Sequence, residues 1–276
     1  MTATADSRKT LSLFGLMFIA LTVFVYFFGL NIPLLGPDEP RYAQVAREMF
    51  ERGDWVTPTL GGFDWFEKPA LLYWMQIAAY HLFGVTEFAA RFGSALFGLG
   101  TIASLYLFAR RMPENDRQTN TFAGLTAMIA ATSLGLIVFS RGASFDIVLT
   151  FPVTAALVSF YIADSRRRDG LSDSLPLFYA FTGLALLAKG LVGMIFPLMI
   201  AAAFFVAVWR RPSAKVLLSP LWGIPLCIAV ASLWYLPMYW QNGWKFIDEF
   251  FIQHHFQRYT SNKYLHPQPF CFFLLV

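Results

Sequence analysis

Long apolar blocks, separated by short basic segments, are the dominant pattern along this chain. The blocks run approximately over residues 11–30, 92–109, 121–140, 147–163, 175–188, 190–209 and 216–240, and a further one begins at 270. A helix needs about 20 mainly apolar residues to cross roughly 30 Å of hydrocarbon. The pattern therefore predicts an all-α fold, a polytopic transmembrane helix bundle, with residues 1–276 forming one membrane module.

The two ends of the chain support two further predictions. The block at 11–30 has 20 residues and no small-residue cleavage site after it. These features favour an uncleaved first helix over a signal peptide. The last block stops at Val276 after seven residues, which is too short for a span. We therefore expect the chain to be the N-terminal part of a longer protein.

The stretch from Ala70 to Phe83 decides the predicted topology. It has 14 residues and contains Gln76 and His81, which is short for a span and typical of an interfacial helix. If it does not span, the basic clusters all fall on one side, as the positive-inside rule requires. These clusters are Arg8/Lys9, Arg110/Arg111/Arg117, Arg166/Arg167/Arg168 and Arg210/Arg211/Lys215. The N-terminus is then cytoplasmic, and residues 31–91 form an interfacial loop on the outer, periplasmic side.

The first part of this outer loop has helical periodicity. One apolar face is formed by Tyr42, Val45, Ala46, Met49 and Phe50. Pro40 suits the first helical position and Gly53 suits a C-terminal stop. The pattern predicts a short amphipathic helix on the outer membrane surface.

The chain must turn back near Lys189 and Gly190, because segments 175–188 and 190–209 start and end on the cytoplasmic side of this topology. Fourteen helical residues rise only about 21 Å. We therefore expect the turn at the floor of a cavity, since non-helical backbone at that depth is tolerated only inside protein or beside water. A lysine there costs roughly 2.5–3.5 kcal/mol in lipid. It indicates either an anionic substrate or a structural ion pair.

Composition agrees with the membrane assignment and narrows the function. Hydrophobic residues make up 57% of the chain and charged residues only 14%, against about 25% charged in soluble proteins. The net charge of +4 comes mostly from residues that flank apolar blocks, so we expect no nucleic-acid partner. Cys227 and Cys271 lack metal-ligand spacing. The chain has no P-loop, G-x-G-x-x-G or H-E-x-x-H motif, which fits a donor delivered as a lipid phosphate.

Acidic and basic side chains gather in the segments predicted to face the outer side. Asp38 and Glu39 stand at the start of the amphipathic helix, with Arg41 close by. They are either capping charges or an active-site carboxylate with substrate contacts. Glu67 and Lys68 precede the interfacial helix. One interpretation is that both side chains simply reach from the lipid boundary to water. The other is that Glu67 binds a cation and Lys68 contacts a lipid phosphate.

Three more candidates occur further along the chain. Asp146 stands at the start of the 147–163 helix, as a functional acid or as the structural partner of Arg141. His255 and Arg258 are three residues apart and can share a helical face. With a carboxylate, His255 could bind a divalent metal such as Zn, Mg or Mn. The alternative for His255 is a structural role.

Ordered motifs resemble the ArnT family of GT-C membrane glycosyltransferases, in the wider group of protein O-mannosyltransferases. The motifs are GPDEPRY at 36–42, WFEKPAL at 65–71, EFAAR at 87–91, Ser140-Arg141 through Asp146, Ala188-Lys189-Gly190 and HFQR at 255–258. Members of the family transfer 4-amino-4-deoxy-L-arabinose from undecaprenyl phosphate to lipid A. They continue through further spans and a periplasmic domain.

The resemblance implies roles for individual residues, position by position. Asp38 matches the catalytic carboxylate, and Asp146 matches a second acid of the cavity. Lys68 and Arg258 match contacts to the carrier phosphate. Glu67 matches an acid associated with a metal, and His255 matches its partner. From their places in the sequence, Glu39, Arg41 and Lys189 are expected to bind substrate.

We therefore expect a glycosyltransferase of the bacterial inner membrane that moves a sugar from undecaprenyl phosphate to a lipid A phosphate at the periplasmic face. One alternative is transfer to a hydroxyl, as in the protein O-mannosyltransferases. Another is a lipid transporter or flippase, which broken helices and charges inside the membrane would suit, although no internal repeat is visible. A third is an inactive fragment.

Overall fold

The structure is a computed structural model that describes residues 3–112, 116–166 and 174–257, with side chains over 13–112, 119–164 and 174–253. The elements are α1 (Ala3–Phe27), α2 (Asp38–Arg52), β1 (Thr59–Leu60), β2 (Phe63–Asp64), α3 (Leu71–Phe83), α4 (Glu87–Ala109), α5 (Asp116–Thr132), α6 (Leu134–Ser140), α7 (Phe145–Arg166), α8 (Leu175–Lys189), α9 (Leu191–Ala207), α10 (Ala214–Leu218), α11 (Pro220–Phe246) and the π-helix η1 (Ile247–Gln257). The predicted all-α class is confirmed.

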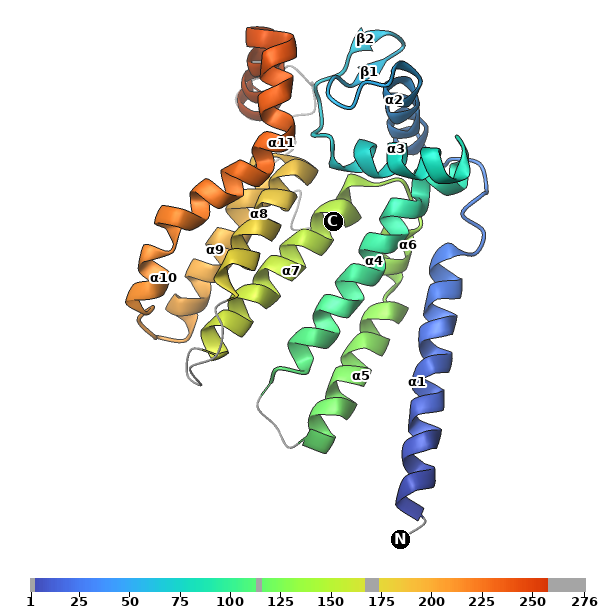
Figure 1. The fold of residues 1–276 in the computed structure, drawn as a ribbon, viewed down its shortest axis with the longest axis vertical. Coiled ribbons are helices and arrows are strands. Elements are labelled where there is room, and N and C mark those ends of the chain that lie inside the picture. Colours follow the sequence, from blue (N-terminus) through green and yellow to red (C-terminus); the bar gives the residue numbers. More distant parts are fainter. Residues whose placement is uncertain (1–2, 113–115, 167–173, 258–276) are drawn as a thin grey trace, which may run out of the picture.

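The long helices form a bundle, and the first loop forms a cap at one end of it (Figure 1). In the cap, α3 lies across the ends of the bundle helices, with α2 and the β1–β2 hairpin beyond it. The predicted amphipathic helix is therefore present as α2. Its predicted stop is also confirmed, since Gly53 caps it with a φ of 65°. Helix α2 begins at Asp38, two residues before Pro40, which the first turn accommodates because its N–H groups have no intrahelical partner.

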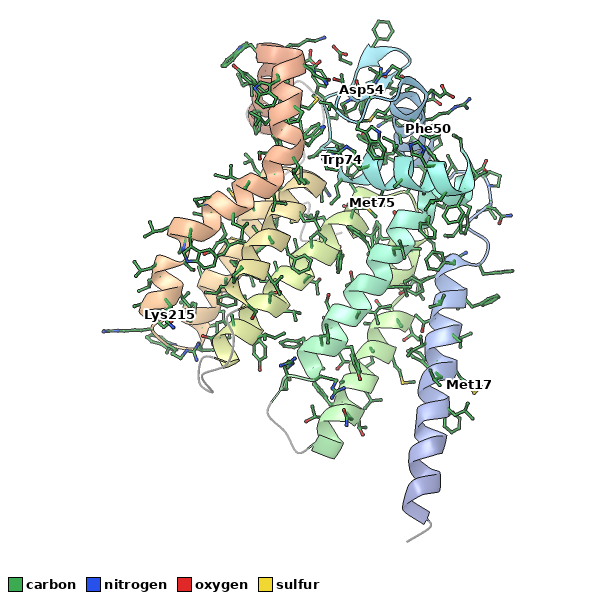
Figure 2. All side chains as sticks on the ribbon, in the orientation of Figure 1. Met17, Phe50, Asp54, Trp74, Met75 and Lys215 are labelled. Atoms are coloured by element: carbon green, nitrogen blue, oxygen red, sulfur yellow. The ribbon has the colours of Figure 1, made fainter. Side chains whose placement is uncertain are left out.

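Three described helices are long and apolar enough to cross a membrane, and a bent pair makes a fourth. The three are Glu87–Ala109, Phe145–Asp164 and Pro220–Gln253; the pair is Thr119–Thr132 with Leu134–Ser140, bent by 60° at Ser133. The apolar parts of α1, α8 and α9 are shorter, at 10–17 residues. Helix α1 exposes apolar side chains such as Met17, which is labelled on it in Figure 2. Spanning by these three shorter helices stays a prediction.

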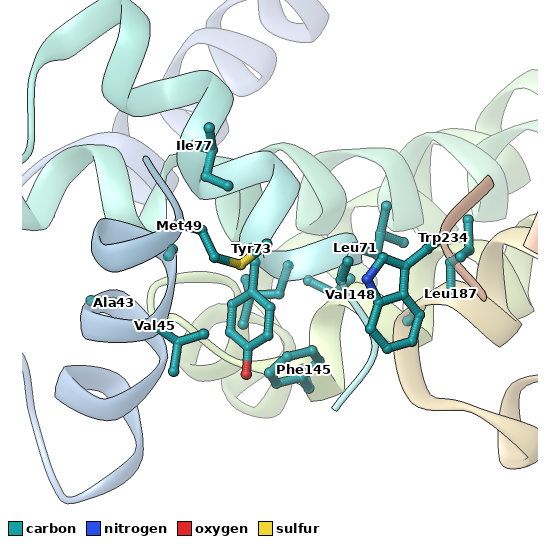
Figure 3. Packing of buried hydrophobic residues seen from close by; sticks show 14 of the residues in the cluster. Ala43, Val45, Met49, Leu71, Tyr73, Ile77, Phe145, Val148, Leu187 and Trp234 are labelled. Atoms are coloured by element: carbon teal, nitrogen blue, oxygen red, sulfur yellow. The ribbon is translucent and has the colours of Figure 1, made fainter. Parts of the chain in front are cut away.

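A buried cluster fixes the cap to the bundle (Figure 3). Met49 of α2 and Tyr73 of α3 belong to the same cluster as Phe145 of α7 and Trp234 of α11. The Tyr73 and Phe145 rings meet edge to face, with centroids 5.4 Å apart. The indole N–H of the fully buried Trp234 donates to the carbonyl of Val56 at 2.8 Å. Apolar packing therefore holds the loop in one orientation relative to the helices.

Glu48 of α2 organises the hairpin, an element the sequence pattern did not predict. Its carboxylate accepts bonds from the backbone N–H groups of Gly61 and Gly62, at 2.7 and 3.2 Å, and from the hydroxyl of Thr59 at 2.7 Å. Burial raises the pKa of Glu48, but these bonds, together with one from the side-chain amide of Gln44, outweigh it and bring the pKa to about 2. Lys245 near the end of α11 adds an ion pair to Asp64 at 2.6 Å. The cap is therefore tied to the bundle by charge as well as by packing.

Glycines allow the helix pairs of the bundle to approach closely. A Cβ added at Gly193 of α9 would lie 2.0 Å from the carbonyl oxygen of Ala185 in α8. One added at Gly98 of α4 would lie 2.1 Å from the hydroxyl oxygen of Ser140 in α6. Small residues at such crossings are how membrane helices bring their backbones together.

Gly193→Ala is expected to destabilise the protein by about 1–3 kcal/mol, because the added methyl group forces α8 and α9 apart. The measurement is thermal unfolding in detergent. Gly124→Ala in α5 is the matched control, since nothing lies within 4 Å of a Cβ there. It should be neutral or stabilising by up to about 1 kcal/mol through helix propensity. Equal effects of the two substitutions would contradict the close α8–α9 contact.

Candidate active site

A cavity of about 520 Å³ lies where the end of α1, the start of α2, the α6–α7 connection and the α8–α9 turn meet. Its charged lining residues are Asp38, Glu39, Lys68, Arg91, Arg141, Asp146 and Lys189. Its apolar wall includes Leu30, Ile32, Leu35, Ile137, Val138 and Phe139. The lining has four cationic and three acidic side chains, which favours an anionic ligand. The apolar wall adjoins helices whose outer faces expose apolar side chains.

Arg91 is the most deeply buried charge near this cavity. Its side chain is 2% exposed and ion-paired with Glu39. Nε and Nη2 donate to the two carboxylate oxygens of Glu39, at 3.1 and 2.7 Å. Nη1 donates to the carbonyls of Leu30 and Ile32, at 2.7 and 2.6 Å, and Nη2 also donates to that of Pro33 at 3.0 Å. All five N–H donors of the guanidinium are therefore used.

Glu39 connects this cation to two further segments. Its carboxylate accepts the backbone N–H of Leu35 at 2.6 Å and that of Ala143 at 2.7 Å. Burial raises the pKa of the carboxyl, but the bonds from Arg91, Leu35 and Ala143 outweigh it, so the pKa lies below its ordinary value. Glu39 thus links the α1–α2 connection, the start of α2, α4 and the α6–α7 connection. The hydrogen bonds of Glu39 hold these segments in position. Its direct contact with substrate stays a prediction.

Asp38 stands next to this anchored glutamate and faces the cavity. Its side chain is 62% exposed and forms an ion pair with Arg41 at 3.3 Å, one turn along α2. The guanidinium of Arg41 also lies over the ring of Trp65, 5.6 Å from its centroid. A solvated carboxylate on a fixed backbone is suited to orient a substrate group or to accept a proton.

Lys189 ends α8 and pairs with Asp146 in the first turn of α7, at 2.5 Å. The turn that places it is a single residue, Gly190, with a φ of 68°. The prediction that this turn borders a cavity is confirmed. The alternative partner considered for Asp146 was Arg141, and that pairing is wrong for the described residues. Arg141 instead donates to the carbonyl of Val25 at the end of α1.

Tyr42 lies among the carboxylates of the site. Burial is the largest cause that raises the pKa of its hydroxyl. The negative charges of Asp38, Glu67 and Asp146 raise this pKa further, and the positive charge of Arg41 lowers it. The resulting pKa is about 12. The hydroxyl therefore remains a neutral donor at physiological pH. Tyr42 lines the same cavity as two of these carboxylates, Asp38 of α2 and Asp146 of α7.

The structure brings five of the predicted site residues to the cavity: Asp38, Glu39, Lys68, Asp146 and Lys189. Arg41 and Glu67 do not line it, although Arg41 binds the cavity residue Asp38. The side chain of His255 and the whole of Arg258 lie outside the described residues. Their roles, and those of the residues at the cavity, stay predictions.

A metal site is not formed by the described side chains alone. They contain no group of three or more His, Cys, Asp or Glu residues placed to hold an ion. Glu67 is half-buried, and its proposed partner His255 is not described at the side-chain level.

Arg91, Arg141 and Tyr42 are cavity residues that the sequence reasoning did not select. Arg91 carried a signal, since it is a charge at the edge of an apolar block and charges there tend to be functional. Arg141 was considered only as a partner of Asp146. Tyr42 was assigned to the apolar face of α2, and nothing in the local pattern marks its hydroxyl.

Residues 10–252 match the family described as dolichyl-phosphate-mannose-protein mannosyltransferase. The chain belongs to this family. Among curated relatives, the undecaprenyl phosphate-alpha-4-amino-4-deoxy-L-arabinose arabinosyl transferase of Serratia proteamaculans is 34% identical over 94% of this chain and 46% of its own length. The protein of the same name from Aeromonas hydrophila is 32% identical over 92% of this chain and 46% of its own length.

Solved structures agree with these matches. ArnT from Cupriavidus metallidurans bound to undecaprenyl phosphate aligns with a TM-score of 0.78 and 28% identity, over 94% of this chain and 47% of that one. Its apo state aligns with the same TM-score and 27% identity, over 90% and 46%. The resemblance to ArnT and the GT-C type of fold are confirmed, and the chain is a multi-pass membrane protein. It spans about half the length of the curated relatives it matches.

Glu39→Gln is expected to destabilise the protein by about 3–5 kcal/mol, because it leaves the buried Arg91 charge without its counter-ion. Glu51→Gln is the matched control. It lies on the same helix and pairs with Arg47 at 2.7 Å, but both side chains are about half exposed, so its loss of stability should be far smaller. Thermal unfolding of both variants checks this. Similar losses would show that burial of the pair is unimportant.

Acid should selectively weaken the contact between Glu39 and Arg91. Because folding lowers the pKa of Glu39 from its ordinary 4.5, its contribution is complete above that pH and is lost as the pH falls through the lowered value. The stability difference between the parent protein and Glu39→Gln should therefore shrink steadily below about pH 4.5. Denaturation midpoints measured from pH 7 to pH 3 test this. A constant difference across that range would be inconsistent with an ionised Glu39.

Proposed function

We propose that this chain forms the membrane-embedded part of a glycosyltransferase that uses a sugar carried on undecaprenyl phosphate, with lipid A as acceptor. The cavity carries the proposal, because it joins exposed carboxylates, several cations and an apolar wall at one end of the bundle. Membership of the mannosyltransferase family supports the reaction class. The carrier and the sugar, 4-amino-4-deoxy-L-arabinose, follow from the names of the arabinosyl transferases and of the undecaprenyl phosphate complex.

The proposed reaction breaks the bond between the anomeric carbon and the carrier phosphate oxygen and forms one to an acceptor oxygen. Negative charge develops on the departing undecaprenyl phosphate. Lys68 and Lys189 both line the cavity, so their ammonium groups would offset this charge. Preorganised charge of this kind is usually a large catalytic term. Arg258 is proposed as a further phosphate contact, from its place in the HFQR motif.

The role of Asp38 depends on the acceptor. A lipid A phosphate is already anionic and needs little base, so Asp38 would orient the acceptor or bind the amino group of the sugar. A hydroxyl acceptor must lose a proton, and Asp38 would then act as general base. Asp146 would tune Lys189 through their ion pair, and Arg41 would hold Asp38. Glu67 and His255 remain the proposed positions for a divalent metal.

We place this protein in the bacterial inner membrane with the cap and the cavity on the periplasmic side. The distribution of basic clusters supports this orientation. The arrangement of α3 supports the same orientation. Its 13 residues lie across the end of the bundle instead of continuing along it, as the topology with all basic clusters on one side requires.

Asp146→Asn is expected to tighten binding of undecaprenyl phosphate about threefold, because it frees Lys189 and removes a negative charge from the cavity. Lys189→Ala should weaken binding by a similar or larger factor, up to about tenfold, or 1.4 kcal/mol. Titration of the purified protein with undecaprenyl phosphate measures both dissociation constants. Arg47→Ala, at an exposed pair on α2 away from the cavity lining, is the control. Weaker binding in Asp146→Asn would oppose the proposed role of this ion pair.

Asp38→Asn tests the reaction itself. Radiolabelled aminoarabinose on undecaprenyl phosphate is supplied with lipid A or with a serine- and threonine-rich peptide. Labelled lipid A, with moderate loss in Asp38→Asn and greater loss in Lys68→Ala, would support the proposal. Labelled peptide, with a loss of about 10²–10⁴-fold in Asp38→Asn, would support hydroxyl transfer. Carrier binding without transfer to either acceptor would favour lipid transport or an inactive fragment.

A further inference from the structure

A second hollow lies at the end of α9, at the opposite end of the α8–α9 hairpin from the cavity. We name it the α9–α10 corner; it comprises residues 205–218. The hollow has a volume of about 390 Å³ and is lined by Phe205, Val206, Trp209, Arg210, Arg211 and Pro212. Helix α9 has 17 residues, so the corner is about 25 Å along the helix from Lys189. It is therefore separate from the proposed active site.

The backbone of the corner forms a Schellman motif at the end of α9. The N–H of Trp209 donates to the carbonyl of Val206 at 3.1 Å, and the N–H of Arg210 donates to that of Phe205 at 3.2 Å. This pair of bonds requires a left-handed residue just after the helix cap, usually glycine. Here that residue is Trp209, with a φ of 49°. A tryptophan in this conformation is strained, so its side chain needs another explanation.

Packing within the protein does not provide that explanation. The Trp209 side chain is 96% exposed, so it contributes nothing to the core of the described residues. Tryptophan is enriched at the membrane–water interface, where its ring sits among headgroups and its N–H remains hydrated. Val206, which lines the same hollow, is strongly exposed, and so are Leu217 and Leu218 of α10 in the same corner. The corner therefore has the composition of a surface that meets lipid.

The charges of the corner favour an anionic lipid. Arg210 is neutralised by Asp164 and lies over the ring of Phe205, 5.7 Å from its centroid. Arg211 and Lys215 are exposed, and neither has an acidic partner among the described side chains. Lys215 projects away from the bundle in Figure 2. Two exposed cations beside an exposed tryptophan are complementary to a lipid phosphate and the apolar chains below it.

We propose that the α9–α10 corner binds an anionic phospholipid. Arg211 and Lys215 hold its phosphate, Trp209 lies at the level of its glycerol backbone, and Val206, Leu217 and Leu218 contact its acyl chains. The site is independent of the proposed transfer reaction, since it uses no residue of the cavity. Its test measures lipid binding and does not require transfer activity.

The first test measures quenching of Trp209 fluorescence by brominated lipid. The protein is reconstituted in phosphatidylcholine vesicles that contain equal small fractions of brominated phosphatidylglycerol or brominated phosphatidylcholine. Subtraction of the fluorescence of the Trp209→Phe variant gives the fluorescence of Trp209 alone. We expect brominated phosphatidylglycerol to quench several-fold more, and Arg211→Gln with Lys215→Gln to remove the preference. Arg111→Gln, an exposed arginine after α4, is the control. Equal quenching by both lipids, or equal loss in the control, overturns the proposal.

The second test uses the strain at Trp209. Trp209→Gly suits the left-handed position better, so its melting temperature in plain detergent should be unchanged or higher. The rise in melting temperature on adding phosphatidylglycerol should nevertheless shrink in this variant. An undiminished rise in Trp209→Gly, or the same rise with inorganic phosphate in place of the lipid, overturns the proposed phospholipid site.

Discussion

The buried ion pair between Arg91 and Glu39 fixes how the α1–α2 connection and the start of α2 meet the bundle. A guanidinium withdrawn from water must satisfy all its donors, because each unpaired buried N–H is costly. The five bonds of Arg91 draw the carbonyls of Leu30, Ile32 and Pro33 toward α4, which turns the chain at the end of α1. Glu39 then fixes the start of α2 and the N–H of Ala143. One wall of the cavity, formed by the α1–α2 connection and the start of α2, is therefore built around one cation.

The three acidic side chains of the cavity each have a cationic partner before any ligand enters. Glu39 is held by Arg91, Asp146 by Lys189 and Asp38 by Arg41. Burial differs among them: the first pair is almost inaccessible, whereas Asp38 and Asp146 are more than half exposed. In the proposed reaction, an entering phosphate could replace Asp38 or Asp146 as the partner of a cation, while the Arg91–Glu39 pair keeps the backbone in place. The arrangement separates residues that hold geometry from residues that can change partners during a reaction.

Local patterns in the sequence predicted much of this fold. The apolar blocks located the long helices, and Gly53 and Gly190 marked chain reversals that the structure confirms. Contacts between distant segments were not predictable in the same way. The partner of Asp146 is 43 residues away, so a nearer arginine was the natural but wrong alternative. Likewise, Glu48 shapes a hairpin through glycine N–H groups 13 and 14 residues on, which no periodicity reveals.

The single-residue turn at Gly190 has a consequence for biosynthesis. The 15 residues of α8 and the 17 of α9 are in backbone contact through Gly193, so the two helices pack as one tight hairpin. In the orientation proposed above, the pair inserts as one hairpin with Lys189 leading across the hydrocarbon. Asp146 of α7 supplies the counter-ion of that ammonium. The ion pair that borders the cavity therefore also neutralises the charge at the tip of the hairpin and ties the hairpin to α7.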